Sequence, residues 1–311
     1  MQHLYRFSLK QLSVFVTIAE TQSVSVAAQQ LAMSQSAASM ALSQLESGLG
    51  QRLFERQGKR LRLNHWGHWL RPRAKRILME SQHVMQGFAG QQIISGELAV
   101  GASQTIAEYF LAQIISRLDQ DYPDLVISPQ ISNTESVLGG LLDYRLQLGM
   151  IEGHCVDSRI VQQVWCEDHL VVVAGQQHPL ATKSQVNLAS LSRARWVLRE
   201  GGSGTREIFN GAIHGKITRL KVWREYNHVP SLIALVANGA YLSCLPWRSV
   251  EQAVQAGQLV RLTTPDLDMR RSFNFVWRKD SSQNPLRDCL IEQALALNTG
   301  SIPHPSLDLL S

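Results

Sequence analysis

The sequence predicts a chain of two parts, an N-terminal all-α part and a C-terminal α/β part. Within the first 90 residues, apolar positions repeat every three or four residues, which is typical of amphipathic helices. After Ser95 and Gly96, short apolar segments alternate with helical ones, which is typical of an α/β domain. A length of 311 residues, 44% of them hydrophobic and 18% charged, provides enough apolar surface for more than one core.

The positive charge of the chain lies in the N-terminal part. The whole chain carries 30 Lys and Arg and 25 Asp and Glu residues, a formal net charge of +5. Residues 1–90 contain eleven Lys and Arg against four Glu residues, so this part has a net charge of +7 and residues 91–311 a net charge of −2. Such an asymmetry is typical of a polyanion-binding module joined to a part with another role.

Composition excludes several classes of protein. No stretch approaches the roughly 18–20 apolar residues that a membrane span needs, so we expect no membrane partner. The four cysteines form no C-x-x-C pair and have no histidine at zinc-finger spacing. We therefore expect neither a disulfide scaffold nor a metal site, and no cofactor.

Three helices are predicted within the first fifty residues. The first spans about residues 8–20. The second begins at Ser23 or Ser25 and the third at Ser34, because serine is a favoured N-cap residue, and the third ends near Gly48. Only two residues separate the second helix from the third, which is typical of a helix-turn-helix, whose second helix enters the DNA major groove.

The third helix and the residues after it carry side chains suited to DNA. Glutamine pairs bidentately with adenine, and a serine hydroxyl serves several base edges. Over residues 53–63, Leu61 and Leu63 alternate with cations, which predicts a two-stranded wing that reaches phosphates. A solvated helix face is the alternative for the third helix alone, and the neighbouring cations favour the DNA contact. The candidate DNA-binding residues are Ser34, Gln35, Ser36, Ser39, Met40, Ser43, Arg52, Arg56, Lys59, Arg60 and Arg62.

A long helix is predicted between the two parts, over about residues 65–90. Its one helix breaker, Pro72, comes early enough to be accommodated in a first turn or a slight kink. Apolar and small residues repeat by three and four, as in the seam of a coiled coil, and the opposite face is cationic. An ordinary core helix is the alternative, but the regular seam favours a dimerising helix. The seam residues are Leu70, Ala74, Ile77, Ser81, Val84 or Met85, and Phe88, and the opposite face carries Arg71, Arg73, Lys75 and Arg76.

Short apolar segments predict the strands of the C-terminal part. The clearest helix between them places Ile106, Phe110, Ile114 and Leu118 on one face. We expect an α/β arrangement in which parallel strands dominate. The predicted strands cover residues 97–102, 125–131, 146–151, 169–175, 195–200, 241–245 and 273–277.

Hydroxyl and amide side chains follow three of these strands, where helices are expected to begin. In open α/β sheets, ligands bind beyond the carboxyl ends of strands, where helix N-termini point. Each junction by itself is explained by an N-cap, but three together, one glycine-rich and ending in arginine, favour an anion site. The candidate effector-binding residues are Ser103, Thr105, Asn133, Thr134, Gly202, Ser203, Gly204, Thr205 and Arg206.

Enzyme signatures are not found around these residues. The segment Gly201–Thr205 is not a G-x-S-x-G elbow, and it lacks the Gly-Lys-Ser/Thr ending of a P-loop. A hydrolase using Ser203 would need a base beside it, and none is predicted. His154, with Glu152 and Cys155, is expected to form a polar rim. We therefore predict no catalytic residues.

Residues 9–67 resemble the winged helix-turn-helix of LysR-type transcriptional regulators. The resemblance is carried by LKQLSVFVTIAETQSVSVAAQQL, MSQSAASMALSQLESGLGQRLFER and LRLNHWG. Three positions depart from the family pattern: Ser36 stands where the family usually has Pro, Met40 where it has Arg, and Asn64 where it has Thr. Without that arginine, the operator sequence is not predicted from relatives.

The resemblance implies the organisation of the whole chain. It implies a winged helix-turn-helix domain over residues 1–65, a dimerisation linker helix over 66–91, and an effector-binding domain over 92–297, which resembles a periplasmic binding protein. A flexible tail, 298–311, would follow. Within the effector domain, subdomain I would comprise residues 92–162 and 269–297, and subdomain II residues 163–268, with a cleft between them.

The segment REGGSGTRE resembles the CysL-like and CbbR-like branch of the family, which includes regulators of sulfur assimilation and of carbon fixation. This resemblance implies a small anionic effector. The candidates are an inorganic oxyanion, such as sulfite or sulfate, and a phosphorylated metabolite.

The sequence is therefore interpreted as a LysR-type DNA-binding transcription regulator, modulated by a small anion. Expected partners are double-stranded DNA at pseudo-palindromic promoter sites, further copies of the chain in a homodimer or homotetramer, and RNA polymerase as a further candidate. The expected location is cytoplasmic and nucleoid-associated. The alternative is a cytoplasmic small-molecule-binding protein without sequence-specific DNA recognition.

Overall fold

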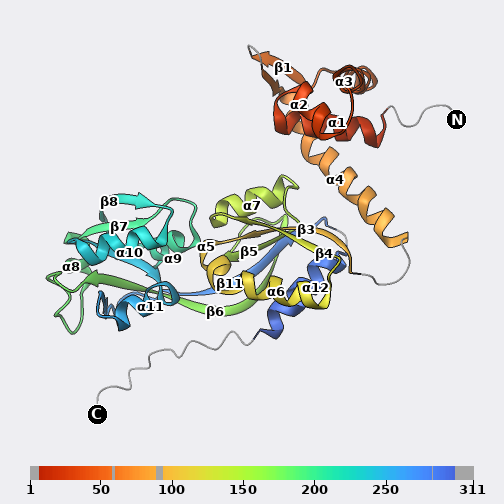
Figure 1. Cartoon of the computed structure of the whole chain (residues 1–311). Helices are drawn as coiled ribbons and strands as arrows, with labels where there is room; N and C mark the ends of the chain where they lie inside the picture. The colour runs from red at the N-terminus through yellow and green to blue at the C-terminus, as the bar shows by residue number, and fades with distance from the viewer. Residues whose placement is uncertain (1–6, 58–59, 89–93, 282, 298–311) are drawn as a thin grey trace. The chain divides into compact units, whose positions relative to one another are not determined.

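The computed structural model describes residues 7–57, 60–88, 94–281 and 283–297. The chain divides into two compact units, residues 1–93 and residues 94–311, and each has its own core (Figure 1). No helix in the described ranges is both long and apolar enough to span a membrane.

The first unit is a helix-turn-helix with a small wing. Ser8, Ser23 and Ser34 cap the first three helices, so the second helix begins after Ser23 and not after Ser25. The apolar faces of the helices meet in one core around Phe15 and Leu45. The elements are α1 (Leu9–Thr21), α2 (Val24–Gln30), α3 (Gln35–Leu49), the antiparallel strands β1 (Phe54–Gln57) and β2 (Arg60–Leu63), and α4 (His65–Phe88).

Helix α4 is continuous through Pro72. The residues of the predicted dimerisation seam, however, do not all lie on its exposed surface. Leu70 and Ala74 are buried in the core of the first unit, where α4 packs on α1, so a second chain cannot contact them. Ile77 and Val84 are 37% and 58% exposed. Met85 and Phe88 also lie on α4, but their side chains are outside the described part.

One cation of α4 was assigned to the wrong face. Lys75 was predicted on the exposed face, but its side chain is 8% exposed, and its ammonium lies 2.6 Å from the carboxylate of Glu20. Position 75 follows the buried Ala74 around the helix, so the side chain runs along the packed interface with α1. The pair connects the long helix to α1.

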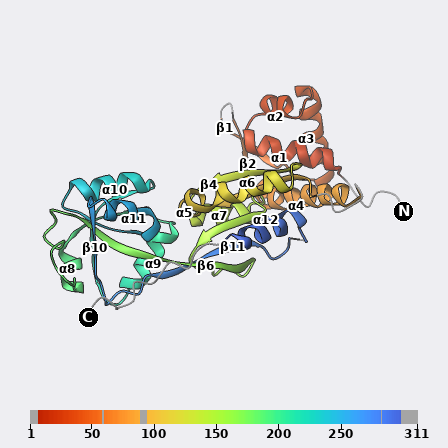
Figure 2. The ribbon, with the colours of Figure 1, turned by 60° about the horizontal axis from the view of Figure 1, so that its bottom comes forward.

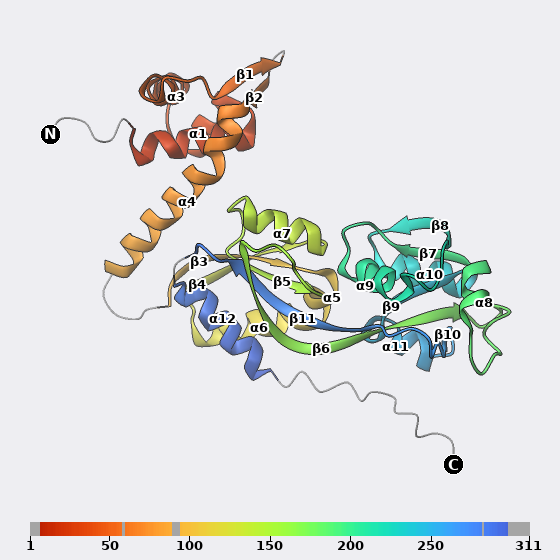
Figure 3. The ribbon, with the colours of Figure 1, turned by 180° about the vertical axis from the view of Figure 1, so that it is seen from behind.

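The second unit consists of two lobes. Lobe I has the parallel strands β3 (Gly96–Ala102), β4 (Leu125–Ile131) and β5 (Leu148–Glu152). Helix α7 (Thr134–Leu142) covers one face of its sheet, and α6 (Ala112–Asp121) and α12 (Pro285–Ala296) cover the other (Figure 3). A short α5 (Gln104–Ile106) and a π-helical turn, Ala107–Leu111, lead into α6.

Lobe II repeats this plan. Its parallel strands are β7 (Arg195–Arg199), β8 (Lys221–Tyr226) and β9 (Leu242–Pro246), and β10 (Leu259–Leu262) is added at one side. Two cores fill the two faces of its sheet. The first involves α8 (Leu188–Arg193) and α9 (Gly204–Ile213), and the second involves α10 (Val229–Asn238) and α11 (Trp247–Gln255).

Two long antiparallel strands join the lobes, and one of them, β6, extends into both (Figure 2). Strand β6 (Ile160–Gly175) pairs antiparallel with β11 (Arg270–Arg278), and β6 continues into lobe II, where it pairs antiparallel with β9 and β10. The expectation that parallel strands dominate is therefore only half correct: each lobe has a parallel set of three strands, and every pairing of these long strands is antiparallel.

Strands β8 and β10 and the first half of β6 were not predicted from the sequence. Strand β8 is exposed along most of its length, as an edge strand, so it has no buried apolar run. The first half of β6 is only partly buried and mixes glutamines with apolar residues. Neither segment has the apolar pattern on which strand prediction depends.

Candidate functional site

The start of α3 presents an exposed polar surface. Gln35, Ser36, Ser39, Met40 and Ser43 are all exposed, with Met40 at 59%. The opposite face of the helix is buried in the core of the unit, which holds this surface outward. Ser34 is also exposed, but its hydroxyl accepts a hydrogen bond from the backbone N–H of Ala37, so its first role is to cap the helix.

The predicted cations lie in and around the wing. Arg52 and Arg62 are exposed, and Leu61 and Leu63 pack toward the core, as the alternation predicted. Arg56 and Arg60 lie on β1 and β2, with side chains outside the described part, and Lys59 is outside it altogether.

Asn64 joins the wing to α4. Its side-chain oxygen accepts from the N–H of Gly67 at 2.9 Å, and its Nδ2 donates to the carbonyl of Arg52 at 2.8 Å. A Cβ at residue 67 would lie 2.2 Å from the carbonyl oxygen of Leu53, so this close approach requires glycine. Asparagine thus provides the helix cap at the position where the resemblance led us to expect threonine.

The three polar junctions of the second unit meet between its lobes. Ser103, Asn133 and Ser203 begin α5, α7 and α9. The N–H of Glu135 in lobe I donates to the carbonyl of Gly202 in lobe II at 3.1 Å. A Cβ at Gly204 would lie 2.7 Å from the carbonyl oxygen of Glu152, so α9 begins in close contact with lobe I.

Glu152 lies buried at the centre of this contact. Its carboxylate accepts from the hydroxyls of Ser103 at 3.2 Å and Thr205 at 3.1 Å, and from Nη1 of Arg271 at 2.9 Å. Arg271 also pairs with Asp168 at 2.6 Å. The prediction that Glu152 belongs to a polar rim is wrong, because the residue is 3% exposed and bound on several sides.

Glu152 keeps its negative charge in the interior. Burial acts to raise the pKa of its carboxyl. The Arg271 guanidinium and the Thr105 hydroxyl outweigh burial, with help from Arg199 and Thr205, and hold this pKa below its ordinary value. The hydroxyls of Ser103 and Thr205, predicted to face an anion from outside, therefore donate to a carboxylate of the chain itself.

Other polar groups between the lobes have no such partner. The hydroxyls of Thr134 and Ser203 and Nη1 of Arg199 are buried without a hydrogen bond to any described residue. The Arg199 side chain is 4% exposed, and its Nε and Nη2 donate to Glu200 at 2.8 and 3.0 Å. Arg199 was not among the predicted residues, although its position at the end of a strand, before a glycine-rich loop, is typical of a ligand contact.

Arg206, the arginine that ends the glycine-rich junction, is held by contacts within lobe II. Its Nη1 donates to the carbonyl of Arg199 and to Glu225, both at 2.9 Å, and its Nε donates to Asn210 at 3.1 Å. These contacts connect α9 to the ends of β7 and β8. Arg206 does not line the cavity, and its role as an anion-binding fork stays a prediction.

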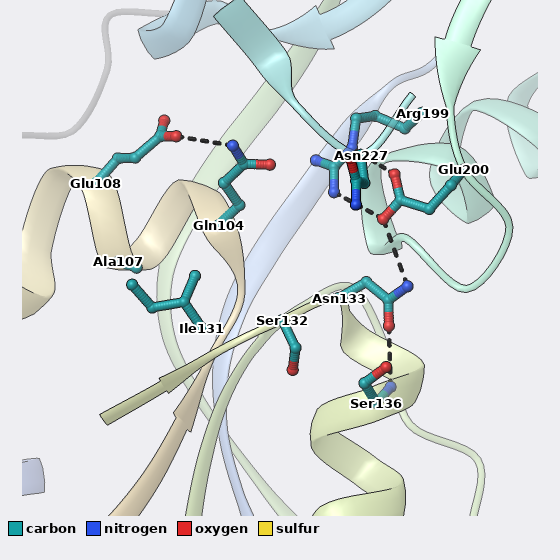
Figure 4. A pocket seen from close by; sticks show the side chains of 10 residues that line it. All are labelled: Gln104, Ala107, Glu108, Ile131, Ser132, Asn133, Ser136, Arg199, Glu200 and Asn227. Atoms are coloured by element: carbon teal, nitrogen blue, oxygen red, sulfur yellow. Dashed lines mark hydrogen bonds and ion pairs between the residues drawn. The ribbon is translucent and has the colours of Figure 1, made fainter. Parts of the chain in front are cut away.

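A cavity of about 630 Å³ lies beside these groups (Figure 4). Of the predicted effector-binding residues, only Asn133 lines it. The side chain of Asn133 points toward Glu200 and donates to it at 3.4 Å. The lining residues are Gln104, Ala107, Glu108, Ile131, Ser132, Asn133, Ser136, Arg199, Glu200 and Asn227.

The described residues do not form a metal site or a nucleophile with its base. No group of three His, Cys, Asp or Glu residues is placed to hold a metal ion in the part of the chain that the structure covers. The Ser203 hydroxyl has no hydrogen-bond partner among the described residues, so no described base is in position to activate it.

Comparison with known proteins identifies both units. The model described as "Bacterial regulatory helix-turn-helix protein, lysR family" matches residues 9–68, and the model "LysR substrate binding domain" matches residues 91–298. Together these matches cover most of the chain.

Individual relatives match over nearly the whole length. The HTH-type transcriptional regulator YeiE of Escherichia coli is 37% identical over 91% of this chain and 94% of its own. CysL of Bacillus subtilis is 28% identical, covering 85% and 89%, and the RuBisCO operon transcriptional regulator of Allochromatium vinosum is 27% identical, covering 93% and 96%. The predicted resemblance to this group is confirmed.

The fold also matches a solved structure. A full-length OxyR variant from Pseudomonas aeruginosa has a TM-score of 0.73 at 21% identity, covering 93% of this chain and 98% of that one. The predicted fold class, a helical helix-turn-helix domain followed by an α/β domain, is confirmed.

Proposed function

This chain belongs to the LysR family of bacterial DNA-binding transcription regulators, and we propose that a small anion bound between the lobes of its second unit controls its action on DNA. The family membership favours this proposal over the alternative, a cytoplasmic small-molecule-binding protein without sequence-specific DNA recognition. It also makes the chain a regulator and not an enzyme.

The exposed surface of α3 and the cations around the wing support the DNA-binding part of the proposal. Gln35 and its neighbours can reach base edges in the major groove, and Arg52 and Arg62 can reach phosphates. We place this contact on pseudo-palindromic promoter sites, read by a homodimer or homotetramer, with RNA polymerase as a further partner. A cytoplasmic, nucleoid-associated location follows from this role.

One observation carries the anion-binding part: three buried hydrogen-bond donors near the contact of the two lobes have no partner in the described chain. These donors are Nη1 of Arg199 and the hydroxyls of Ser203 and Thr134. Buried polar groups are rarely left unpaired, because each one costs free energy. The hydroxyls also lie at the N-termini of α9 and α7, where the helix dipoles favour negative charge. A bound anion would satisfy Nη1 of Arg199, the one of these three residues that lines the cavity.

The proposed ligand is an inorganic oxyanion, such as sulfite or sulfate, or a phosphorylated metabolite. Its binding would connect α7 of lobe I to α9 of lobe II, and would therefore favour one arrangement of the lobes over another. Relatives named CysL and RuBisCO operon regulator support a search among the anions of sulfur and carbon metabolism.

A matched pair of arginine variants tests this assignment. A panel of small anions is screened by thermal shift on the wild type, and the affinity of each hit is then measured for Arg199→Lys and Arg206→Lys. We expect Arg199→Lys to weaken binding about tenfold or more, because lysine lacks the forked guanidinium. Arg206→Lys should leave the affinity nearly unchanged. Equal loss in both variants, or loss only in Arg206→Lys, would contradict the site.

A further inference from the structure

The cavity between the lobes contains more negative than positive charge. Among its lining residues, Arg199 is the one cation, and Glu108 and Glu200 are both acidic. The ionised Glu152 lies behind this surface, close enough to Arg199 to be affected by its charge. An anion that binds here must therefore approach at least one carboxylate as well as the guanidinium.

Glu200 is the carboxylate next to the unpartnered donor. Its Oε2 accepts from Nε of Arg199, and its Oε1 accepts from Nη2 of Arg199 and from Nδ2 of Asn133. The remaining nitrogen of the same guanidinium, Nη1, is the one without a partner in the described chain. Figure 4 shows the Arg199 and Glu200 side chains together at the wall of the cavity. A ligand oxygen bound to Nη1 thus lies near a group that can only accept hydrogen bonds.

This arrangement distinguishes anions by their protons. An oxygen without a proton is repelled by the Glu200 carboxylate, since neither group can donate. A ligand O–H or N–H instead donates to it in a charge-assisted hydrogen bond. The same carboxylate therefore penalises one kind of anion and stabilises another.

We propose that Glu200 makes the cleft select anions that carry a hydrogen-bond donor over fully deprotonated oxyanions of similar size. The preferred ligands are protonated oxyanions and organic anions with a hydroxyl or amino group. The inference rests on the proposed function, because it assumes that an anion binds beside Arg199.

The experiment compares anions of matched shape. Phosphate and arsenate keep at least one proton near pH 7, whereas sulfate and selenate have none. Titration calorimetry at constant ionic strength measures each affinity for the full chain. We expect the wild type to bind the protonated pair about ten- to a hundredfold more tightly, the range of a hydrogen bond to a charged group.

Variants assign the selectivity to one side chain. In Glu200→Gln the amide can also donate, so the preference should fall to within about threefold. Glu200→Asp retains the carboxylate and should keep part of the preference, which separates selectivity from a folding defect. Glu207→Gln is the matched control: it removes one charge from an exposed position of α9 that does not line the cavity, and should keep the full preference.

The possible failures are distinguishable. Sulfate binding to the wild type as tightly as phosphate would overturn the selectivity and leave the anion site intact. A preference that survives Glu200→Gln but disappears in Glu108→Gln would show that the wrong carboxylate was chosen. If none of these four anions, nor any other of the wider panel, binds the wild type, the anion site itself is refuted and the selectivity with it.

Discussion

At the scale of single residues, the Glu152–Arg271 pair lies at the contact between the lobes, where both side chains bind the Thr205 hydroxyl of lobe II. Both side chains are almost completely buried, and Arg271 also neutralises part of the charge of Asp168. Removing one member of a buried ion pair leaves the other charge without compensation, which usually costs more than the pair contributes. The pair is therefore sensitive to the loss of either partner.

Replacing Glu152 by Gln tests this sensitivity. We expect the unfolding free energy near neutral pH to fall by about 3 kcal/mol, because Arg271 loses a buried counter-ion. Urea denaturation followed by circular dichroism measures the change. An unfolding free energy within about 0.5 kcal/mol of the wild type, the range of an ordinary surface substitution, would contradict the importance of the pair.

The same variant has a defined pH signature. The pKa of Glu152 is lowered in the folded state from its ordinary value of 4.5, so its stabilising contribution is complete above about pH 4.5 and is lost as the pH falls through the folded-state pKa. Below pH 4.5 the wild type should therefore lose stability more steeply than Glu152→Gln. Parallel pH profiles for the two proteins would refute this assignment.

At the scale of elements, α9 contains two glycines in different surroundings. Gly204 begins the helix, where a Cβ would lie 2.7 and 2.8 Å from atoms of Glu152 and Thr134 in the other lobe. Gly211 lies near the end of the same helix, where a Cβ would meet nothing within 4 Å. The first glycine permits contact between the lobes, whereas the second has no comparable role.

Alanine at each glycine distinguishes these roles. Gly204→Ala should destabilise the second unit by about 1–3 kcal/mol, the usual cost of overpacking, and should weaken the binding of any anion hit. Gly211→Ala should be neutral or stabilise the protein by up to about 1 kcal/mol, because alanine favours helix. Thermal unfolding of both variants measures the difference. Similar stability of the two variants would mean that the lobes adjust to the added methyl group at no cost.

Those helices whose formation depends on neighbouring residues were predicted correctly from the sequence. The serine N-caps of the first helices and the apolar face of the helix after β3 are present as expected, with Ile106 and Ile114 completely buried. Strands β8 and β10 were missed. Both acquire strand geometry from pairing with partners distant in the chain, and neither has a long apolar run of its own.

At the scale of the whole molecule, the boundary between the basic part of the chain and the rest nearly coincides with the boundary between the two compact units. The unit that carries the net charge of +7 is the one that matches the lysR-family helix-turn-helix. When a cationic side chain contacts a DNA phosphate, a counter-ion is released from the DNA. Each such contact therefore increases the salt dependence of DNA binding. Base contacts contribute to sequence preference instead.

Two substitutions in the first unit separate these effects. Arg62→Ala should weaken binding to promoter and random DNA alike, and should reduce the slope of log affinity against log salt by about one. Gln35→Ala should change the preference between operator sequences and leave that slope nearly unchanged. Fluorescence anisotropy at several salt concentrations measures both. A sequence-specific loss in Arg62→Ala would refute the phosphate contact, and equal losses on all DNA in Gln35→Ala would refute the base contact.

The sequence by itself determined the family, the two-part plan and the exposed surface of α3. These features depend on local properties, namely helical periodicity, N-cap residues and the distribution of charge along the chain. Only the tertiary structure shows which arginine lines the cavity between the lobes. Arg206 is engaged by Glu225 at the edge of lobe II, whereas Arg199 lines the cavity. Glu152 meets its partner Arg271 across 119 residues of chain. Side-chain direction depends on such distant neighbours, and no pattern in nearby residues reveals them.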